Sequence, residues 1–108
     1  MTQIENLEAM LAQGKDGALV RYGLGTAYAA KPDQAAKEQA KAHLTACVGF
    51  DPEYSAAYLK LAQVLQALGK IAEADQMYSQ GIAVATRQGD KQAAKTMTVL
   101  QKKMTSQG

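Results

Sequence analysis

The pair of side chains whose types and spacing best suit chemistry is His43 and Cys47, four residues apart. On a helix this spacing places both on one face, where an imidazole and a thiolate can bind one metal ion side by side. The sequence has no second cysteine or histidine to complete such a site, and carboxylates are poor companions for a thiolate. We therefore expect a core cysteine beside a surface histidine, with no metal and no cofactor.

The acidic residues also lack a pattern typical of catalysis. Asp16, Asp33, Asp51 and Asp90 each stand where a segment with helical spacing begins, and aspartate is a preferred residue for capping the first turn of a helix. There is no Ser-His-Asp arrangement with supporting context, no phosphate-binding glycine loop and no cofactor fingerprint. We expect no catalytic residues, and an enzyme is not the predicted class.

Composition predicts closely packed helices in one domain. The chain has 108 residues, about a fifth of them alanine, with no tryptophan and one phenylalanine. The net charge of +2 is close to neutral and does not by itself indicate an acidic partner.

Three features predict a cytoplasmic location. A single cysteine cannot form an internal disulfide, which fits a reducing compartment. No apolar stretch approaches the roughly 20 residues needed to span a bilayer. The first residues lack a basic region followed by an apolar run, so they do not form a secretory signal.

The clearest structural pattern is a helical hairpin over residues 55–88. Apolar residues recur at helical spacing on both sides of a turn at Gly69-Lys70, and Gly69 can adopt the left-handed conformation that ends a helix. Ala62 and Ala74 are small where the two helices must approach closely. The apolar positions are Tyr58, Leu61, Ala62 and Leu65 before the turn, and Ile71, Ala74, Tyr78 and Ile82 after it.

The preceding segment repeats this pattern. Leu24, Gly25 and Tyr28 match Leu61, Ala62 and Leu65, while Ala40, Leu44, Cys47 and Val48 match Ala74, Tyr78, Gly81 and Ile82. The hairpin over 55–88 is about 34 residues long, and Asp51-Pro52 closes the unit before it, so the chain resembles the tetratricopeptide repeat family, in its small bacterial form. Two departures are Arg21, where the family prefers a large aromatic residue, and about three extra residues at Lys31-Pro32-Asp33.

The resemblance implies an all-α fold, a right-handed α-solenoid of antiparallel helical hairpins with about six helices. Thr2 and Glu5 have the spacing of a capping box, so the first helix should begin at Gln3, and Gly14 should end it. Asp16 should cap the second helix, and Asp51 should cap a later helix that has Pro52 as its first residue. The expected units are an N-terminal half repeat over 3–13, repeats over 17–50 and 52–88, and a capping helix over 90–105.

For function, the resemblance implies a non-catalytic adaptor or scaffold that binds a peptide or a partner's helix in its concave groove. The family's C-terminal-carboxylate clamp is essentially absent, since Tyr22, Thr26 and Lys60 occupy its positions. The groove positions carried over from the family are Leu19, Tyr22, Thr26 and Ala29 in the first repeat, and Ala56, Leu59, Lys60, Gln63 and Gln66 in the second.

The last helix supports two alternatives. An apolar strip of Met97, Leu100 and Met104, if this helix docks loosely, predicts a homodimer. Residues 86–108 carry five basic residues against one acid, Asp90, a net charge of +4, so this helix is also a candidate for contact with nucleic acid or an anionic membrane. We regard the contact with nucleic acid or a membrane as less favoured than a solvated capping helix, because solenoids need a polar outer end.

Overall fold

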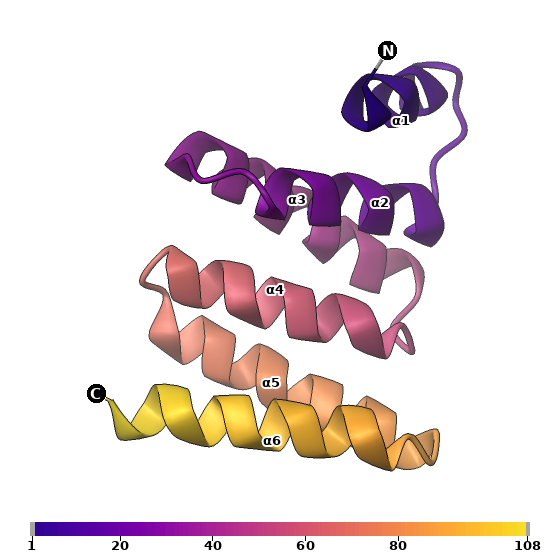
Figure 1. The fold of residues 1–108 in the computed structure, drawn as a ribbon. Coiled ribbons are helices and arrows are strands. Elements are labelled where there is room, and N and C mark those ends of the chain that lie inside the picture. The colour runs from indigo at the N-terminus through magenta and orange to yellow at the C-terminus, as the bar shows by residue number, and fades with distance from the viewer. Residues whose placement is uncertain (1, 108) are drawn as a thin grey trace.

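Residues 2–107 form six α-helices without a strand in a computed structural model (Figure 1). This confirms the predicted all-α fold class. Within the same residues, none of the helices combines the length and the apolar character needed to cross a membrane. The helices are α1 (Gln3–Ala12), α2 (Ala18–Ala29), α3 (Gln34–Phe50), α4 (Ser55–Ala67), α5 (Ile71–Arg87) and α6 (Lys91–Ser106).

Three helices begin at the predicted caps. Thr2 and Glu5 form the capping box of α1: the Glu5 amide donates to Thr2 Oγ1 at 3.2 Å, and the Thr2 amide donates to Glu5 Oε1 at 3.0 Å. Asp33 accepts from the amide of the third residue of α3 at 3.1 Å, and Asp90 does the same for α6 at 3.0 Å. Each contact satisfies one of the amides that the first turn leaves without an intrahelical partner.

Two predicted caps are wrong. Asp16 accepts from the Gly17 amide at 2.8 Å and from the Arg21 guanidinium, so its carboxylate is turned away from the first turn and Gly17 is the cap residue. Asp51 ends α3 instead of starting α4, because its amide still donates to the Cys47 carbonyl at 2.9 Å. Its carboxylate then accepts from the Glu53 amide in a short turn.

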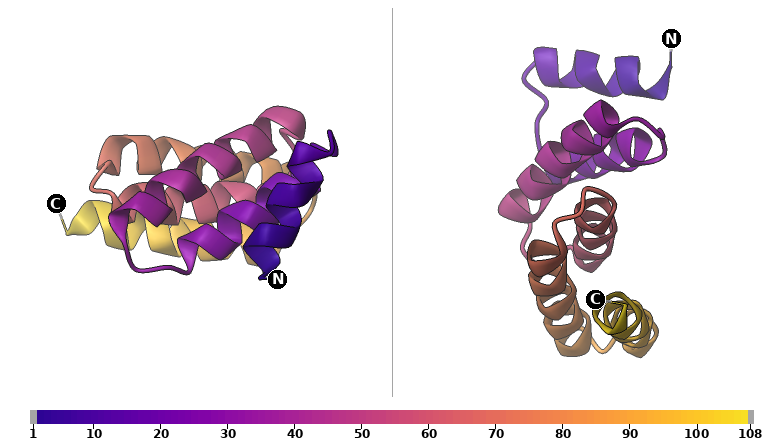
Figure 2. Two further views of the ribbon diagram at one scale, coloured as in Figure 1. Left: turned by 90° about the horizontal axis from the view of Figure 1, so that it is seen from above. Right: turned by 90° about the vertical axis from the view of Figure 1, so that its left-hand side faces the viewer.

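The helices stack as successive hairpins. α2 packs against α3 and α4 against α5, while α4 also contacts α2 and α6 contacts both α4 and α5. Figure 2 (right) shows α3 and α5 along one side of the stack and α4 and α6 along the other. Gly69 makes the reversal between α4 and α5 with a φ of 78°, in the left-handed region predicted for it. At the amino-terminal end α1 contacts α2 alone, and none of its side chains is buried.

The core lies where the predicted apolar positions of the two repeats meet. Gly25 is buried against Leu44, and a β-carbon on Gly25 would lie 2.5 Å from Leu44 Cγ. Only a residue without a side chain therefore allows α2 to approach α3 so closely. The predicted positions that are buried include Leu24, Ala40, Leu44, Cys47, Leu61, Ala62, Leu65, Ala74 and Tyr78. The division into a half repeat, two repeats and a capping helix stays an interpretation of this element order.

Candidate functional site

A hollow of about 170 Å³ lies between the C-terminal half of α2 and the facing part of α4. Four of the predicted groove residues line it: Thr26 and Ala29 from α2, and Lys60 and Gln63 from α4. They come together because α2 and α4 are the first helices of neighbouring hairpins and lie in contact. The carboxamide-bearing Gln63 is exposed and Lys60 is partly exposed, so both can reach a bound molecule.

The other predicted groove positions lie outside this hollow. Tyr22 stacks on Tyr54, with ring centroids 4.8 Å apart and an angle of 29° between the planes. Leu59 is half-buried against the core, and Gln66 accepts a long hydrogen bond of 3.4 Å from the Tyr78 hydroxyl. Ala56 is exposed and does not line the hollow, and Leu19 is 75% exposed one turn before Tyr22.

A second lysine lines the hollow, and sequence reasoning missed it. Lys37, in the first turns of α3, donates from Nζ to the carbonyl of Ala29 at the end of α2. A cation at the C-terminal end of a helix interacts favourably with its free carbonyl groups. The sequence does contain a signal for this contact. Lys37 stands about one helical turn after the chain reversal that precedes α3, and a lysine there can reach back over the end of the preceding helix. With Lys37 and Lys60 in its lining and no carboxylate, the hollow is positively charged.

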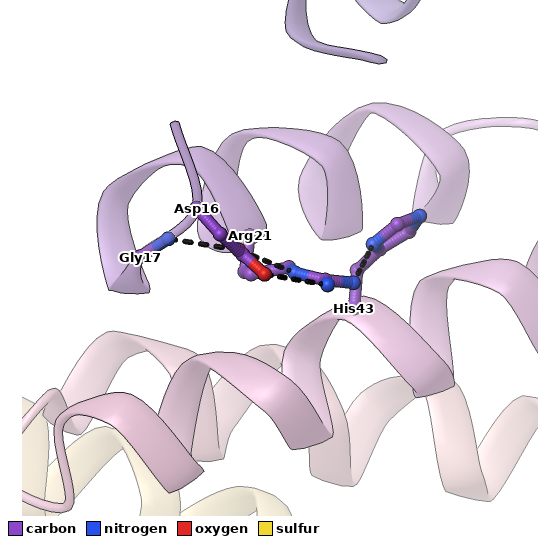
Figure 3. Close-up of polar contacts among 4 residues, drawn as sticks. All are labelled: Asp16, Gly17, Arg21 and His43. Carbon is purple, nitrogen blue, oxygen red and sulfur yellow. Dashed lines mark hydrogen bonds and ion pairs between the residues drawn. The ribbon is translucent and has the colours of Figure 1, made fainter. Parts of the chain in front are cut away.

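His43 takes part in a second polar cluster, shown in Figure 3. Arg21 Nε and Nη2 donate to the Asp16 carboxylate at 2.8 and 2.9 Å, and Arg21 Nη1 lies 3.1 Å from His43 Nδ1. Because a guanidinium can only donate, Nδ1 must accept and the imidazole proton must sit on Nε2. His43 is 8% exposed, so the expectation of a surface histidine is wrong.

This cluster joins three helices. The ring of His43 in α3 stacks on Tyr28 of α2 at 5.7 Å, and the Tyr28 hydroxyl donates to Glu8 of α1 at 2.9 Å. Burial and then the nearby Arg21 cation lower the pKa of His43, while Glu8 and Asp16 act weakly in the opposite sense. The cluster therefore holds an uncharged histidine between helices. Where the family prefers a large aromatic residue that packs, Arg21 makes polar contacts with Asp16 and His43 instead.

Cys47 is fully buried, as predicted. Burial, assisted by the charge of Asp51, raises the pKa of its thiol, which disfavours the thiolate needed for nucleophilic or metal chemistry. Within residues 2–107, no group of three or more His, Cys, Asp or Glu side chains is placed to hold a metal ion.

The apolar strip predicted for self-association does not lie exposed. Met97 is 1% and Met104 is 4% exposed, because both side chains fill the core beneath α6, and Leu100 is half-buried against the same core. Gln101 fixes the docking further by donating to Asp75 and Ser79 of α5 at 2.9 Å each. The condition for that homodimer, a loosely docked helix, is therefore not met.

The basic side chains of α6 lie at the surface. Lys91, Lys95, Lys102 and Lys103 are all exposed. Contact of this face with nucleic acid or an anionic membrane stays a prediction.

Comparison with known proteins matches a tetratricopeptide repeat family model to residues 36–98, more than half of the chain. The chain belongs to the tetratricopeptide repeat family. It is 48% identical over 101 residues to the TPR repeat-containing protein PA0015 of Pseudomonas aeruginosa, covering 94% of this chain and 93% of that protein. It is also similar to the solution structure of protein BPP2914 from Bordetella parapertussis, with a TM-score of 0.82 and 38% identity over 99% of this chain and 90% of that one.

Membership of this family indicates a class of function. Tetratricopeptide repeats are typically non-catalytic modules for protein–protein interaction. Membership of the family therefore suggests that this chain interacts with other proteins. The positively charged hollow between α2 and α4 is the candidate binding site.

Proposed function

We propose that this chain is an adaptor that binds a segment of a partner protein across α2 and α4, with a side chain of that segment in the hollow between them. The observation that carries the proposal is that residues from both helices, separated by more than 30 positions in the sequence, line one depression of about 170 Å³. A site of this size holds a single side chain and its adjoining backbone, and it is too small for a drug-sized ligand.

The lining determines what kind of segment fits. Its apolar lining comes from the small side chains Ala29, Val64 and Ala67, which leave space for an aliphatic group. At its rim Lys60 can pair with a carboxylate, and Gln63 can both donate to and accept from a peptide backbone. The Thr26 hydroxyl already donates to carbonyls of its own helix, so only its oxygen lone pairs remain available. The complementary segment combines an aliphatic residue with an acidic one.

The test is selection of binding peptides from a random displayed library on the immobilised 108-residue chain, followed by NMR mapping of the selected peptides. We expect the selected peptides to be enriched in aliphatic and acidic residues, and to shift the amide signals of Thr26, Ala29, Lys60 and Gln63.

The opposite face of the stack supplies a matched control. A hollow of about 290 Å³ there is lined by Lys41, Val48 and Met77, among others. Lys60→Glu should weaken peptide binding at least tenfold, while Lys41→Glu should leave it unchanged. Peptides that lose affinity with Lys41→Glu and keep it with Lys60→Glu would place the binding face on α3 and α5 and contradict the proposal.

A further inference from the structure

The two ends of the stack each carry a helix with an unpartnered face. Inside the stack every first helix of a hairpin packs against a following second helix, as α2 does on α3 and α4 on α5. In the part of the chain that the structure describes, α6 has no helix after it and α1 has no helix before it. Figure 1 shows α1 and α6 at opposite ends of the stack.

The outer face of α6 combines apolar and basic groups. Met97 and Met104 point into the core, so the stripe of Gln92, Lys95 and Val99 on the other side of the helix faces solvent. Val99 is 49% exposed, and a shallow hollow of about 290 Å³ runs along this stripe.

The other end carries a hollow of about 570 Å³ between the first half of α1 and the last turns of α2. Ile4, Ala27 and Tyr28 give it apolar walls, Glu5 adds a carboxylate and Lys31 is the one cation that lines it. In the order of helices along a solenoid, this is where a first helix preceding α1 would lie.

The two end helices carry opposite charge, although Lys31 balances Glu5 within the hollow itself. Between Gln3 and Ala12 the charged residues are Glu5 and Glu8, with no lysine or arginine. Between Lys91 and Ser106 there are four lysines and no acid. An acidic helix at one end and a basic helix at the other favour contact between unlike ends of two molecules and disfavour contact between like ends.

We propose that copies of this chain associate head to tail, with α6 of one copy packed in the hollow between α1 and α2 of the next. The α6 helix of one copy would then be the first helix, and α1 of the next copy the second helix, of one hairpin completed between two molecules. Because the two surfaces differ, the contact is heterologous, and it extends into open chains instead of closing as a symmetric dimer. It does not rest on the function proposed above, because the hollow between α1 and α2 and the hollow between α2 and α4 share Ala30 alone among their lining residues.

Sedimentation equilibrium of the 108-residue chain at low salt, from micromolar to millimolar concentration, tests the association. We expect the average mass to rise past that of a dimer and to fall again on addition of salt, since exposed charge pairs are screened. Val99→Asp, which places a charge in the contact, should raise the dissociation constant at least about tenfold. Phe50→Asp is the matched control, because Phe50 is 55% exposed but ends α3, a helix that contacts neither α1 nor α6.

Mixing two blocked variants separates this arrangement from any symmetric dimer. Val99→Asp blocks the α6 surface, and Ala27→Glu blocks the hollow at α1, so each variant alone should be monomeric with unchanged helical circular dichroism. Their equimolar mixture should form a one-to-one heterodimer and nothing larger, through the two intact surfaces. A wild-type chain that stays monomeric at millimolar concentration, an average mass that levels off at two copies, or no heterodimer in the mixture would overturn the proposal.

Discussion

The thioether of Met97 occupies the space that a side chain at Gly81 would need: a β-carbon there would lie 2.6 Å from Met97 Sδ and 2.8 Å from Tyr58 Cβ. Gly81 is therefore the point at which α4, α5 and α6 meet. The missing side chain on α5 allows α6 to dock closely enough to bury both of its core methionines.

Gly81→Ala should destabilise the fold by about 1–3 kcal/mol, because the new methyl group overlaps a β-carbon of α4 that cannot move without its backbone. The measurement is the free energy of unfolding in urea. Gly49→Ala is the control, since Gly49 lies in α3 with no atom within 4 Å of its β-carbon position. That change should raise stability by about 0.5–1 kcal/mol through helix propensity. Equal effects of the two substitutions would contradict the close approach at Gly81.

Gly69→Val should destabilise the protein by about 1–2 kcal/mol, because a β-branched residue resists the positive φ at this turn. No neighbouring atom lies within 4 Å of the β-carbon position, so the cost comes from the backbone conformation alone. Gly69→Asn should cost clearly less, because asparagine tolerates the left-handed region. Urea unfolding of both variants checks the order, and an asparagine variant less stable than the valine one would refute this origin of the cost.

Stability should fall on mild acidification because of His43. Its pKa in the folded protein lies below the ordinary value of 6.5, so the unfolded chain binds the proton more readily. The full contribution of His43 to the free energy of unfolding is present above pH 6.5. It is lost as the pH falls from there through the lowered pKa of the folded state. The urea midpoint should therefore decrease between about pH 7 and about pH 5.

His43→Gln is the matched variant for this pH dependence. The glutamine side chain keeps an oxygen that can accept from Arg21 but does not titrate. Because His43 is the one histidine of the chain, the variant should lose the decrease between neutral pH and the onset of carboxylate protonation. An unchanged slope in the variant would show that another group is responsible.

Cys47 should react with a thiol reagent only when the protein opens. The side chain is fully buried, and the pKa of its thiol is raised by burial, so both access and thiolate fraction are low. We expect very slow labelling of the native protein near neutral pH and rapid labelling in urea. When opening is fast compared with the reaction, Gly81→Ala should accelerate labelling by the same factor by which it raises the equilibrium constant for unfolding. Rapid labelling of the native chain would contradict the packing of α3.

The sequence was sufficient to predict the repeated core, because the buried residues of a helix recur about every three to four positions and this spacing is visible within a short segment. Leu24, Leu44, Leu61 and Tyr78 are all buried where the alignment of the two repeats expected them. The turn at Gly69 was predictable for a similar reason, since few residues other than glycine adopt its backbone conformation.

The features that escaped prediction depend on contacts between distant segments. His43 is buried because Arg21, 22 residues earlier, supplies its hydrogen-bond partner, and nothing near His43 in the sequence indicates this. Asp51 fails as a cap because α4 starts only after Tyr54, whose ring packs on Tyr22 of the preceding hairpin. In the candidate site, the position of Lys37 over the end of α2 depends on the path of the chain reversal before it.

The contacts of α1 set an order for local unfolding. Because this helix touches α2 alone and buries no side chain, its detachment breaks one interface and exposes little core, whereas release of α4 disrupts its contacts with four neighbours. In a linear array stabilised by nearest neighbours, amide hydrogens should therefore exchange with solvent earliest in α1 and latest in α4 and α5. The amino-terminal helix is thus a detachable cover, and its loss should uncover Tyr28, which bonds to Glu8 of α1, before the interior hairpin opens.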